Sequence, residues 1–337
     1  MYAALLRAPG PIENHPLEYS EVPEPIPGPG EVAISVLACG VCRSNLHMIE
    51  GDWLPGTPAA LPIIPGHEVI GRVKALGPGV DNLSVGDRIG VQPIWSTCGS
   101  CEHCVGGHEQ RCRRRQITGE TRDGGYAEVM LAKANFACKI PDSLSDTEAA
   151  PLLCPGITAY GALKKARLRP GRNVAVFGIG GVGHLALQMA AITGARVNAV
   201  SRSPKARALA EELGAHGSYV PSGSEGGLVL RDGSQDAAIV FAPSDQAVAE
   251  ALRVIKPGGR VILGVSQSVG GMDIGDEKTI VGTVLGTRQD MADVLDLAVD
   301  GKLHAVHEDF PLSEANLVLQ RLKNGQLQGR AVLVPGA

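Results

Sequence analysis

Four cysteines within one short segment carry the strongest chemical signal in this sequence. Cys98, Cys101 and Cys104 follow one another at three-residue steps, and Cys112 comes eight residues later. Four thiolates complete the tetrahedral shell of a zinc ion and leave no position open for chemistry. Chance rarely places four cysteines so close together, so this cluster predicts a structural zinc site.

A second signal is a glycine-rich turn between an expected strand, residues 173–177, and an expected helix, residues 184–192. Its first glycine permits the tight turn, its second lets the backbone approach a pyrophosphate, and its third lets helix and strand pack closely. Phosphates then meet the positive end of the helix. The turn therefore predicts a dinucleotide site, against the alternative of a plain strand-to-helix turn. Its glycines are Gly178, Gly180, Gly181 and Gly183.

The residues after the next expected strand bear on the choice of dinucleotide. An NAD site usually carries an acidic residue there, which binds the ribose hydroxyls. This chain has Ser201 and Arg202, with Lys205 and Arg207 close behind. A hydroxyl and a guanidinium bind a 2′-phosphate that a carboxylate would repel. The prediction is NADP in preference to NAD; the alternative is a solvated basic start of a helix.

The two halves of the chain differ in the order of the strands and helices that their sequences predict. Up to about residue 155, glycine and proline break the chain into short β-type runs, which are typical of an antiparallel, barrel-like domain. From about residue 172, strands alternate with helices, as in a parallel, doubly wound α/β sheet. After residue 290 we expect two amphipathic helices and a final strand. The expected strands are 31–36, 69–73, 88–91, 126–130, 173–177, 196–200, 237–241, 260–265, 279–285 and 331–334, and the expected middle helices are 184–192, 206–213 and 246–256.

Composition excludes several classes of protein. The 337 residues are 44% hydrophobic and 20% charged, with a net charge of −4. Such a chain has no field to attract nucleic acid or an anionic membrane. No apolar run reaches the roughly 18 residues that span a bilayer, and the first residues do not fit a secretory signal. We therefore expect a cytoplasmic protein, in which reduced cysteines serve metals rather than disulfides.

The dispersed cysteines and histidines gain meaning from a resemblance that covers essentially the whole chain. It rests on the cysteine cluster, the glycine turn and four further segments in the same order. These segments are 39–47, 66–68, 152–158 and 286–288. Together they resemble the zinc-containing alcohol dehydrogenases of the medium-chain dehydrogenase/reductase family. The resemblance implies a GroES-like catalytic domain over 1–155, a Rossmann domain over 156–289, and a C-terminal segment, 290–337, that returns to the catalytic domain.

The resemblance also implies the catalytic residues. Cys42, His67 and Cys154 become the ligands of a second, catalytic zinc, with Glu68 just behind the metal. Two thiolates and an imidazole leave one position for water or substrate. Ser44 and His47 match the hydroxyl and the imidazole that carry the alcohol proton away. Among the remaining cysteines, Cys39 and Cys138 match no ligand position and are expected to be small buried hydrophobic residues.

Further matched positions contact the cofactor. Two of them face the pyrophosphate and two pack on the nicotinamide, and a fifth lies at the end of a later strand. They are Arg43 and Arg288, Thr158 and Val182, and Val265.

One position departs from the family pattern. Asn45 stands where members usually carry an aspartate that hydrogen-bonds the zinc-bound histidine. Asparagine still offers an amide oxygen but no charge. We therefore predict a somewhat weaker bond between zinc and His67, and a more electrophilic zinc.

Substrate and assembly are also read from the resemblance. Trp53 and Trp95 fall near the substrate channel and favour a narrow apolar pocket for small primary alcohols and aldehydes, including aromatic ones; alternatively, one or both only pack the barrel. The chain length is similar to that of tetrameric members, with a homodimer as the alternative. Rival functions are a polyol or secondary-alcohol dehydrogenase, a zinc-free quinone or enoyl reductase, and a non-enzymatic dinucleotide-binding protein.

Overall fold

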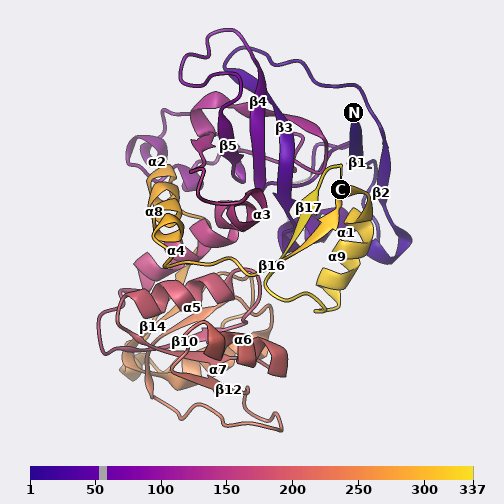
Figure 1. The fold of residues 1–337 in the computed structure, drawn as a ribbon. Helices are drawn as coiled ribbons and strands as arrows, with labels where there is room; N and C mark the ends of the chain where they lie inside the picture. The colour runs from indigo at the N-terminus through magenta and orange to yellow at the C-terminus, as the bar shows by residue number, and fades with distance from the viewer. Residues whose placement is uncertain (53–58, 337) are drawn as a thin grey trace. The chain divides into compact units, whose positions relative to one another are not determined.

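The computed structural model describes residues 1–52 and 59–336, and contacts within the chain divide it into two compact units (Figure 1). The first unit comprises Met1–Cys154 and Ala305–Ala337, and the second comprises Pro155–His304. The C-terminal segment thus joins the first unit, as expected, but it does so from residue 305 rather than 290. Residues 290–304 remain with the second unit.

The main sheet of the first unit has seven strands among the described residues, in the order β16-β17-β3-β4-β5-β9, with β8 paired to β3. Its pairs are antiparallel except for β16 and β17, which run parallel. In Figure 1 the yellow β17, from the C-terminal segment, lies beside the indigo β3. The strands are β3 (Glu31–Gly40), β4 (Val69–Leu76), β5 (Arg88–Val91), β8 (Val129–Lys133), β9 (Cys138–Lys139), β16 (His307–Pro311) and β17 (Arg330–Val334).

Shorter elements complete the first unit. Two small antiparallel pairs are β1 (Tyr2–Leu6) with β2 (Leu17–Glu21), and β6 (Ile94–Ser96) with β7 (Gln116–Ile117). The helices are α1 (Arg43–Glu50), α2 (Glu102–Val105), α3 (Asp146–Ala149) and α9 (Ala315–Lys323). Short 3₁₀ helices are η1 (Ile12–Asn14), η2 (Glu109–Arg111), η3 (Ala134–Phe136), η4 (Ala150–Leu153) and η6 (Leu312–Glu314).

The second unit is a six-stranded parallel sheet of order β12-β11-β10-β13-β14-β15. Its strands are β10 (Asn173–Phe177), β11 (Arg196–Val200), β12 (Gly217–Tyr219), β13 (Gln235–Val240), β14 (Ile255–Leu263) and β15 (Thr279–Gly282). Its helices are α4 (Pro155–Ala166), α5 (Gly183–Ile192), α6 (Pro204–Glu212), α7 (Asp245–Val254) and α8 (Arg288–Val299), with η5 (Ile274–Asp276). This is the expected doubly wound sheet, and the prediction of that architecture is confirmed.

The strand order reverses between β10 and β13, and such a switch point is where doubly wound sheets bind ligands. The two strands pair from Val174 with Ala237 to Phe177 with Val240. Beyond them, the N–H groups of Phe241 and Ala242 both donate to the carbonyl of Phe177. The glycine turn that follows β10 therefore lies at this switch point.

The strand expected over 279–285 ends already at Gly282, and two further expected elements are altered by a neighbouring strand. The strand expected over 126–130 is divided: Tyr126 and Glu128 exchange backbone hydrogen bonds with residues of β1, and β8 begins only at Val129. The helix expected over 246–256 ends at Val254, because Ile255 already pairs with Gln235 in the sheet. In both cases the backbone pairs with a neighbouring strand, and the local pattern of apolar residues does not predict this pairing.

Candidate active site and metal centres

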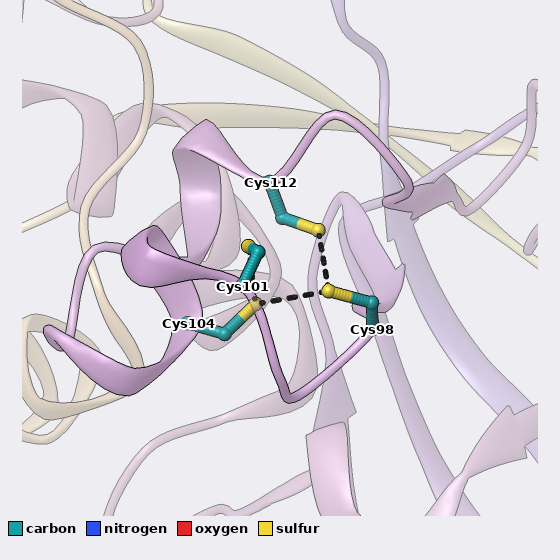
Figure 2. A group of neighbouring side chains, drawn as sticks. All are labelled: Cys98, Cys101, Cys104 and Cys112. Carbon is teal, nitrogen blue, oxygen red and sulfur yellow. Dashed lines mark hydrogen bonds between the residues drawn. The ribbon is translucent and has the colours of Figure 1, made fainter.

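The four clustered cysteines converge around one point, as Figure 2 shows. Cys98 and Cys101 lie before and at the start of α2, Cys104 lies within it, and Cys112 follows η2. Their Sγ atoms are 3.9 Å apart for Cys98 and Cys104, 3.5 Å for Cys101 and Cys104, and 3.6 Å for Cys112 and Cys98. The structure thus brings together all four residues that the spacing singled out.

These separations fit a shared tetrahedral ion. With zinc–sulfur bonds of about 2.3 Å, the edge of a tetrahedron of sulfurs is roughly 3.8 Å. A disulfide would require a sulfur–sulfur distance of about 2.05 Å, and all eight cysteines are free thiols. The donor set therefore suits a closed, four-sulfur zinc site.

The acidity of the thiols is uneven around this cluster. The backbone N–H groups of Ser100 and Cys101 lower the pKa of Cys98 to about 5. At Cys101 the N–H of Cys104 favours the thiolate, but burial and the neighbouring sulfurs outweigh it and raise the pKa to about 11. Several thiolates so close together repel one another, so a divalent cation is what would let all of them ionise.

A second group of ligand atoms is formed by Cys42, His67, Glu68 and Cys154, whose donor atoms lie within 4.8 Å of one another. Cys42 caps the start of α1, His67 and Glu68 precede β4, and Cys154 follows η4. The Sγ atoms of Cys42 and Cys154 are 3.9 Å apart. The Nε2 of His67 is buried without a hydrogen-bond partner among the described residues. A buried imidazole nitrogen without a hydrogen-bond partner, beside two thiols, is suited to bind a metal ion.

Two glycines make room for this group. Gly66 has φ of +101°, and a Cβ there would lie 2.5 Å from the Tyr126 ring and 2.8 Å from the Cys39 sulfur. A Cβ on Gly40 would lie 2.8 Å from the carboxyl carbon of Glu68. Side chains at these positions would displace the segment that carries His67 and Glu68, which explains the glycines on physical grounds.

Glu68 is held by a partner far away in the sequence. Its Oε2 accepts a hydrogen bond of 3.0 Å from the Nε of Arg330 at the start of β17, and its Oε1 pairs closely with the guanidinium Nη2. Both side chains are buried, with relative exposures of 0% for Glu68 and 5% for Arg330. Arg330 thus hydrogen-bonds both carboxylate oxygens of Glu68, and the other three donor atoms of the group belong to Cys42, His67 and Cys154.

The two thiols of this centre differ in acidity. A hydrogen bond from the Cys154 thiol lowers the pKa of Cys42 well below its usual value, against the opposing effect of burial. The same hydrogen bond and burial raise the pKa of Cys154. Cys42 therefore carries thiolate character even before a cation binds.

Asn45 lies on α1 next to His67 and is fully buried. Its Nδ2 is 3.4 Å from the Nδ1 of His67, and its Oδ1 has no partner among the described residues. The residue that departs from the family pattern therefore does contact the imidazole, as the resemblance implied for that position.

The expected proton-relay residues lie on the same helix. Ser44 lies in the first turn of α1 and His47 in its last turn, and the Nδ1 of His47 is 3.0 Å from the Oδ1 of Asp52. Arg43 precedes them and donates a hydrogen bond of 3.1 Å from its Nη2 to the carbonyl of Leu322 on α9. Burial lowers the pKa of Arg43.

In the second unit the glycine turn has the geometry that its spacing predicts. Gly178 has φ of +88°, and a Cβ there would lie 2.7 Å from the Ala242 nitrogen. A Cβ on Gly183 would collide with the carbonyl of Gly178. Around Gly180 nothing lies within 4 Å of an added Cβ, so the space that a pyrophosphate needs stays open. Gly181 is half-buried beside it.

The end of β11 presents the residues that were expected to choose the dinucleotide. Ser201 is half-buried and Arg202 is exposed. The Arg207 guanidinium donates to the carbonyls of Ser201 and Arg202, at 2.8 and 3.0 Å. The segment is therefore held by a cation, and no carboxylate lies between residues 201 and 207.

The remaining expected positions are placed as follows. Thr158 lies in α4, Val182 precedes α5, Val265 follows β14, and Arg288 begins α8, whose first turn is closed by reciprocal hydrogen bonds between Thr287 and Asp290. Trp95 lies in β6 in the core of the first unit, with 4% exposed. Trp53 lies outside the described residues. Of the two dispersed cysteines, Cys39 is buried and Cys138 half-buried.

Two residues of the site were not singled out in the sequence. Arg330 gave no signal, because its partner lies 262 positions earlier and only the sheet brings them together. Asp52 follows His47 by only five residues, and this short spacing between an imidazole and a carboxylate was the available hint. None of the helices in the described part of the chain has the length and apolar character needed to cross a membrane.

The fold and these centres define a class of protein: an oxidoreductase with a dinucleotide-binding sheet and a buried thiolate–imidazole centre. Comparison with known families agrees. Residues 28–142 match the alcohol dehydrogenase GroES-like domain, and residues 181–300 match the zinc-binding dehydrogenase family. An alcohol dehydrogenase from Geobacillus stearothermophilus is 41% identical over 325 residues, which cover 94% of this chain and 96% of that protein.

Solved structures give the same result. An alcohol dehydrogenase from the archaeon Aeropyrum pernix has a TM-score of 0.90 at 31% identity, covering 99% of this chain and 100% of its own. Acetophenone reductase from Geotrichum candidum, in complex with NAD, scores 0.89 at 29% identity, with coverages of 99% and 96%. A zinc-binding dehydrogenase from Sinorhizobium meliloti bound to NADP scores 0.87 at 26%, with 99% of each chain covered. The chain belongs to the zinc-type alcohol dehydrogenases of the medium-chain dehydrogenase/reductase family, so the expected fold and enzyme class are confirmed.

Proposed function

We propose that this alcohol dehydrogenase binds two zinc ions and interconverts small primary alcohols, including aromatic ones, with their aldehydes, using NADP(H). The observation that carries the proposal is the catalytic centre itself. Cys42, His67 and Cys154 offer three buried ligand atoms, while Glu68 is occupied by Arg330. Three protein ligands with a fourth position open are the pattern of a catalytic zinc.

When zinc is bound there, it supplies a Lewis acid that lowers the pKa of an alcohol oxygen and polarises a carbonyl. In alcohol oxidation the carbinol carbon loses a hydride to the oxidised nicotinamide, and the hydroxyl proton is released to solvent. We assign the first transfer of that proton to the Ser44 hydroxyl and the next to His47. Asp52 supports this role, because a carboxylate 3.0 Å from Nδ1 favours the tautomer that carries the ring proton on Nδ1, in which Nε2 is the basic nitrogen.

The four-cysteine site holds the second zinc in this proposal and plays a structural part. Sulfur fills every position of its shell, so no substrate can reach the metal. Its contribution is to fold the segment from Cys98 to Cys112, which contains only short helical turns. Such a segment has little apolar core of its own, and metal binding would supply its folding free energy.

The preference for NADP rests on charge at the end of β11. Ser201 and Arg202 offer a hydroxyl and an exposed guanidinium, and Arg207 lies behind them. A 2′-phosphate would gain charge-assisted hydrogen bonds there, typically about 1.5–3 kcal/mol each. The open space at Gly180 supports pyrophosphate binding in the same unit.

The substrate assignment rests on Trp95 and Trp53, of which Trp95 is described and buried. An indole in this position supplies an apolar surface suited to a small or aromatic substrate. We also propose a homotetramer, or a homodimer. The edge strand β15 supports self-association, because exposed apolar side chains flank it: Val269, Met272, Ile274 and Val284.

Eight free thiols support a reducing location such as the cytoplasm.

The test is the initial rate of benzaldehyde reduction with NADPH and with NADH at matched concentrations, together with the zinc content of the purified protein. We expect two zinc ions per chain and faster turnover with NADPH. Acetophenone reduction with the same reduced cofactors and sorbitol oxidation with NADP+ and NAD+ are assayed in parallel. Turnover of acetophenone or sorbitol alone would replace the primary-alcohol proposal with a secondary-alcohol or polyol dehydrogenase. Turnover mainly with NADH would overturn the cofactor proposal only. Light scattering of the same sample gives the oligomeric state.

A further inference from the structure

A small cleft at the amino-terminal edge of the six-stranded sheet is lined mainly by basic residues. It has a volume of about 270 Å³ and lies between the end of α4 and the starts of β10, β13 and β14. Five cationic side chains and one carboxylate line it. They are Arg167, Arg169, Arg172, Lys256, Arg260 and Asp236. This local excess of four positive charges contrasts with the net charge of −4 for the whole chain.

The single carboxylate is already satisfied. Asp236 Oδ1 is 2.8 Å from Arg172 Nη1 and 3.0 Å from Lys256 Nζ, and Oδ2 accepts the backbone N–H of Asn173 at 2.8 Å. Burial disfavours the charged form, but these three donors outweigh it and lower the pKa of Asp236. Asp236 therefore neutralises part of the charge of Arg172 and Lys256, and its two ion pairs are with these residues rather than with the other three cations.

The other three cations lack such partners. Whereas Arg172 and Lys256 pair with Asp236, the side chains of Arg167, Arg169 and Arg260 form no hydrogen bond or ion pair within the described residues. The Nε of Arg260 is moreover shielded from solvent and unpaired in the described part of the chain. A buried donor left unsatisfied is destabilising, so an anion oxygen that reached this Nε would be stabilising.

The backbone brings these cations together by a tight loop in β14. Ile255 pairs with Gln235 and Arg260 with Ala237, so four residues of β14 bulge out opposite one residue of β13. Gly258 has φ of +71°, and a Cβ on Gly259 would lie 2.8 Å from the Lys256 carbonyl. Glycine at both positions lets the loop close and puts Lys256 and Arg260 at the same edge.

Two effects at this edge oppose each other. In a doubly wound sheet the helices end where the strands begin, so α4 and α7 direct their carboxyl termini toward it. Each such end is equivalent to about −0.5 charge, which is small beside the excess of four positive charges lining the cleft. The cations therefore decide the sign, and the cleft favours an anion.

This edge is not the dinucleotide site. The glycine turn follows the carboxyl end of β10, whereas the cleft lies at its amino end. The five residues of β10 span about 16 Å at roughly 3.3 Å per residue. The volume of about 270 Å³ suits a single phosphate group rather than an extended chain.

We propose that this cleft is a second anion site, which binds a phosphate group through Arg167, Arg169 and Arg260. Guanidinium groups bind phosphate oxygens bidentately, and three of them around one group would also relieve their mutual repulsion. The site is independent of the alcohol dehydrogenase activity and of the choice between NADP and NAD.

The experiment measures the melting temperature, Tm, of the zinc-loaded full chain saturated with NADPH, so that the dinucleotide site is already filled. Inorganic phosphate is added to about 10 mM, where general salting-out effects are small, against potassium chloride at equal ionic strength. A concentration ten times the dissociation constant would raise Tm by about 2–4 °C. An equal effect of chloride would show charge screening only and would overturn the proposal.

Matched variants locate the effect. Arg169→Gln and Arg260→Gln each remove one cation of the cleft, and Arg231→Gln removes an exposed arginine of the same unit outside it. We expect the phosphate-dependent rise to fall by at least half in the two cleft variants and to persist in Arg231→Gln. Without phosphate, the cleft variants should melt no lower than the wild type, because repulsion is relieved. A phosphate-dependent rise that is unchanged in the cleft variants would place the anion elsewhere and overturn the proposal.

Discussion

Arg330 at the start of β17 donates two hydrogen bonds to the carboxylate of Glu68, which directly follows His67. The pair joins the C-terminal strand β17 to the segment just before β4, which contains His67 and Glu68. A buried carboxylate whose cation is removed is far more costly than a lost surface pair, at about 3–5 kcal/mol against 0–1 kcal/mol. The pair therefore couples the stability of the first unit to the geometry behind His67.

Arg330→Met should lower the free energy of unfolding by about 3–5 kcal/mol, because Glu68 is left buried and unpaired. The matched control is Arg321→Met, which breaks a half-exposed pair with Glu308 and should cost at most about 1 kcal/mol. Urea unfolding of the zinc-loaded proteins measures both. Adding Glu68→Gln to Arg330→Met should recover part of the loss, and equal losses in the two single variants would contradict the buried-pair argument.

Asn45→Asp should slow the release of zinc from the catalytic site to a chelator by about 10–100-fold, the usual range for such partners of a metal-bound histidine. Metal binding at Nε2 of His67 would leave the ring proton on Nδ1, and a carboxylate accepts that proton, whereas Asn45 presents its Nδ2 donor to Nδ1 at 3.4 Å. The four-cysteine zinc is an internal control, because its release rate should not change. Equal release from the catalytic site in both proteins would argue against a role for Asn45 in zinc retention.

Cys112→Ser should remove one zinc per chain and lower Tm, while leaving the catalytic zinc in place. The fourth sulfur closes the shell of the structural site, and its loss leaves three thiols without a full complement. Metal analysis and calorimetry give the two readouts. Cys138→Ser, at a cysteine outside both groups, should keep both zinc ions; loss of zinc from that variant would show that the assignment of ligands is incomplete.

Gly180→Ala and Gly183→Ala should distinguish a glycine that leaves space for the dinucleotide from a glycine that the packing of the turn requires. The first places a methyl group where nothing lies within 4 Å, so we expect unchanged Tm and about tenfold weaker dinucleotide binding, equivalent to 1.4 kcal/mol. The second collides with the Gly178 carbonyl and should cost about 1–3 kcal/mol of stability. Fluorescence titration with NADPH and thermal melting measure the two effects. A destabilised Gly180→Ala would mean that this space is filled by the protein.

Ser201→Asp should shift the cofactor preference from NADPH toward NADH. A carboxylate repels the 2′-phosphate and accepts from the ribose hydroxyls instead, and the loss of one charged hydrogen bond corresponds to about 10–150-fold. The ratio of kcat/KM for the two cofactors is the readout. Ser203→Asp, two residues on at the cap of α6, is a matched control that should leave the ratio closer to that of the wild type.

Local sequence determined a large part of this molecule. The spacing of Cys98 to Cys112 was enough to predict one cluster, because a loop of fifteen residues can close on an ion without help from the rest of the chain. The glycine turn was equally local: Gly178 and Gly183 are required by contacts within one strand–turn–helix unit. The alternation of strands and helices then predicted the parallel sheet.

Only the tertiary structure decided which distant residues meet. Cys154 comes within 3.9 Å of Cys42, 112 positions away, and Arg330 reaches Glu68 across 262 positions. The basic cleft likewise joins the end of α4 to the starts of three strands. Periodicity and spacing describe contacts along one element, whereas these pairs depend on sheet order and register, which long-range packing selects.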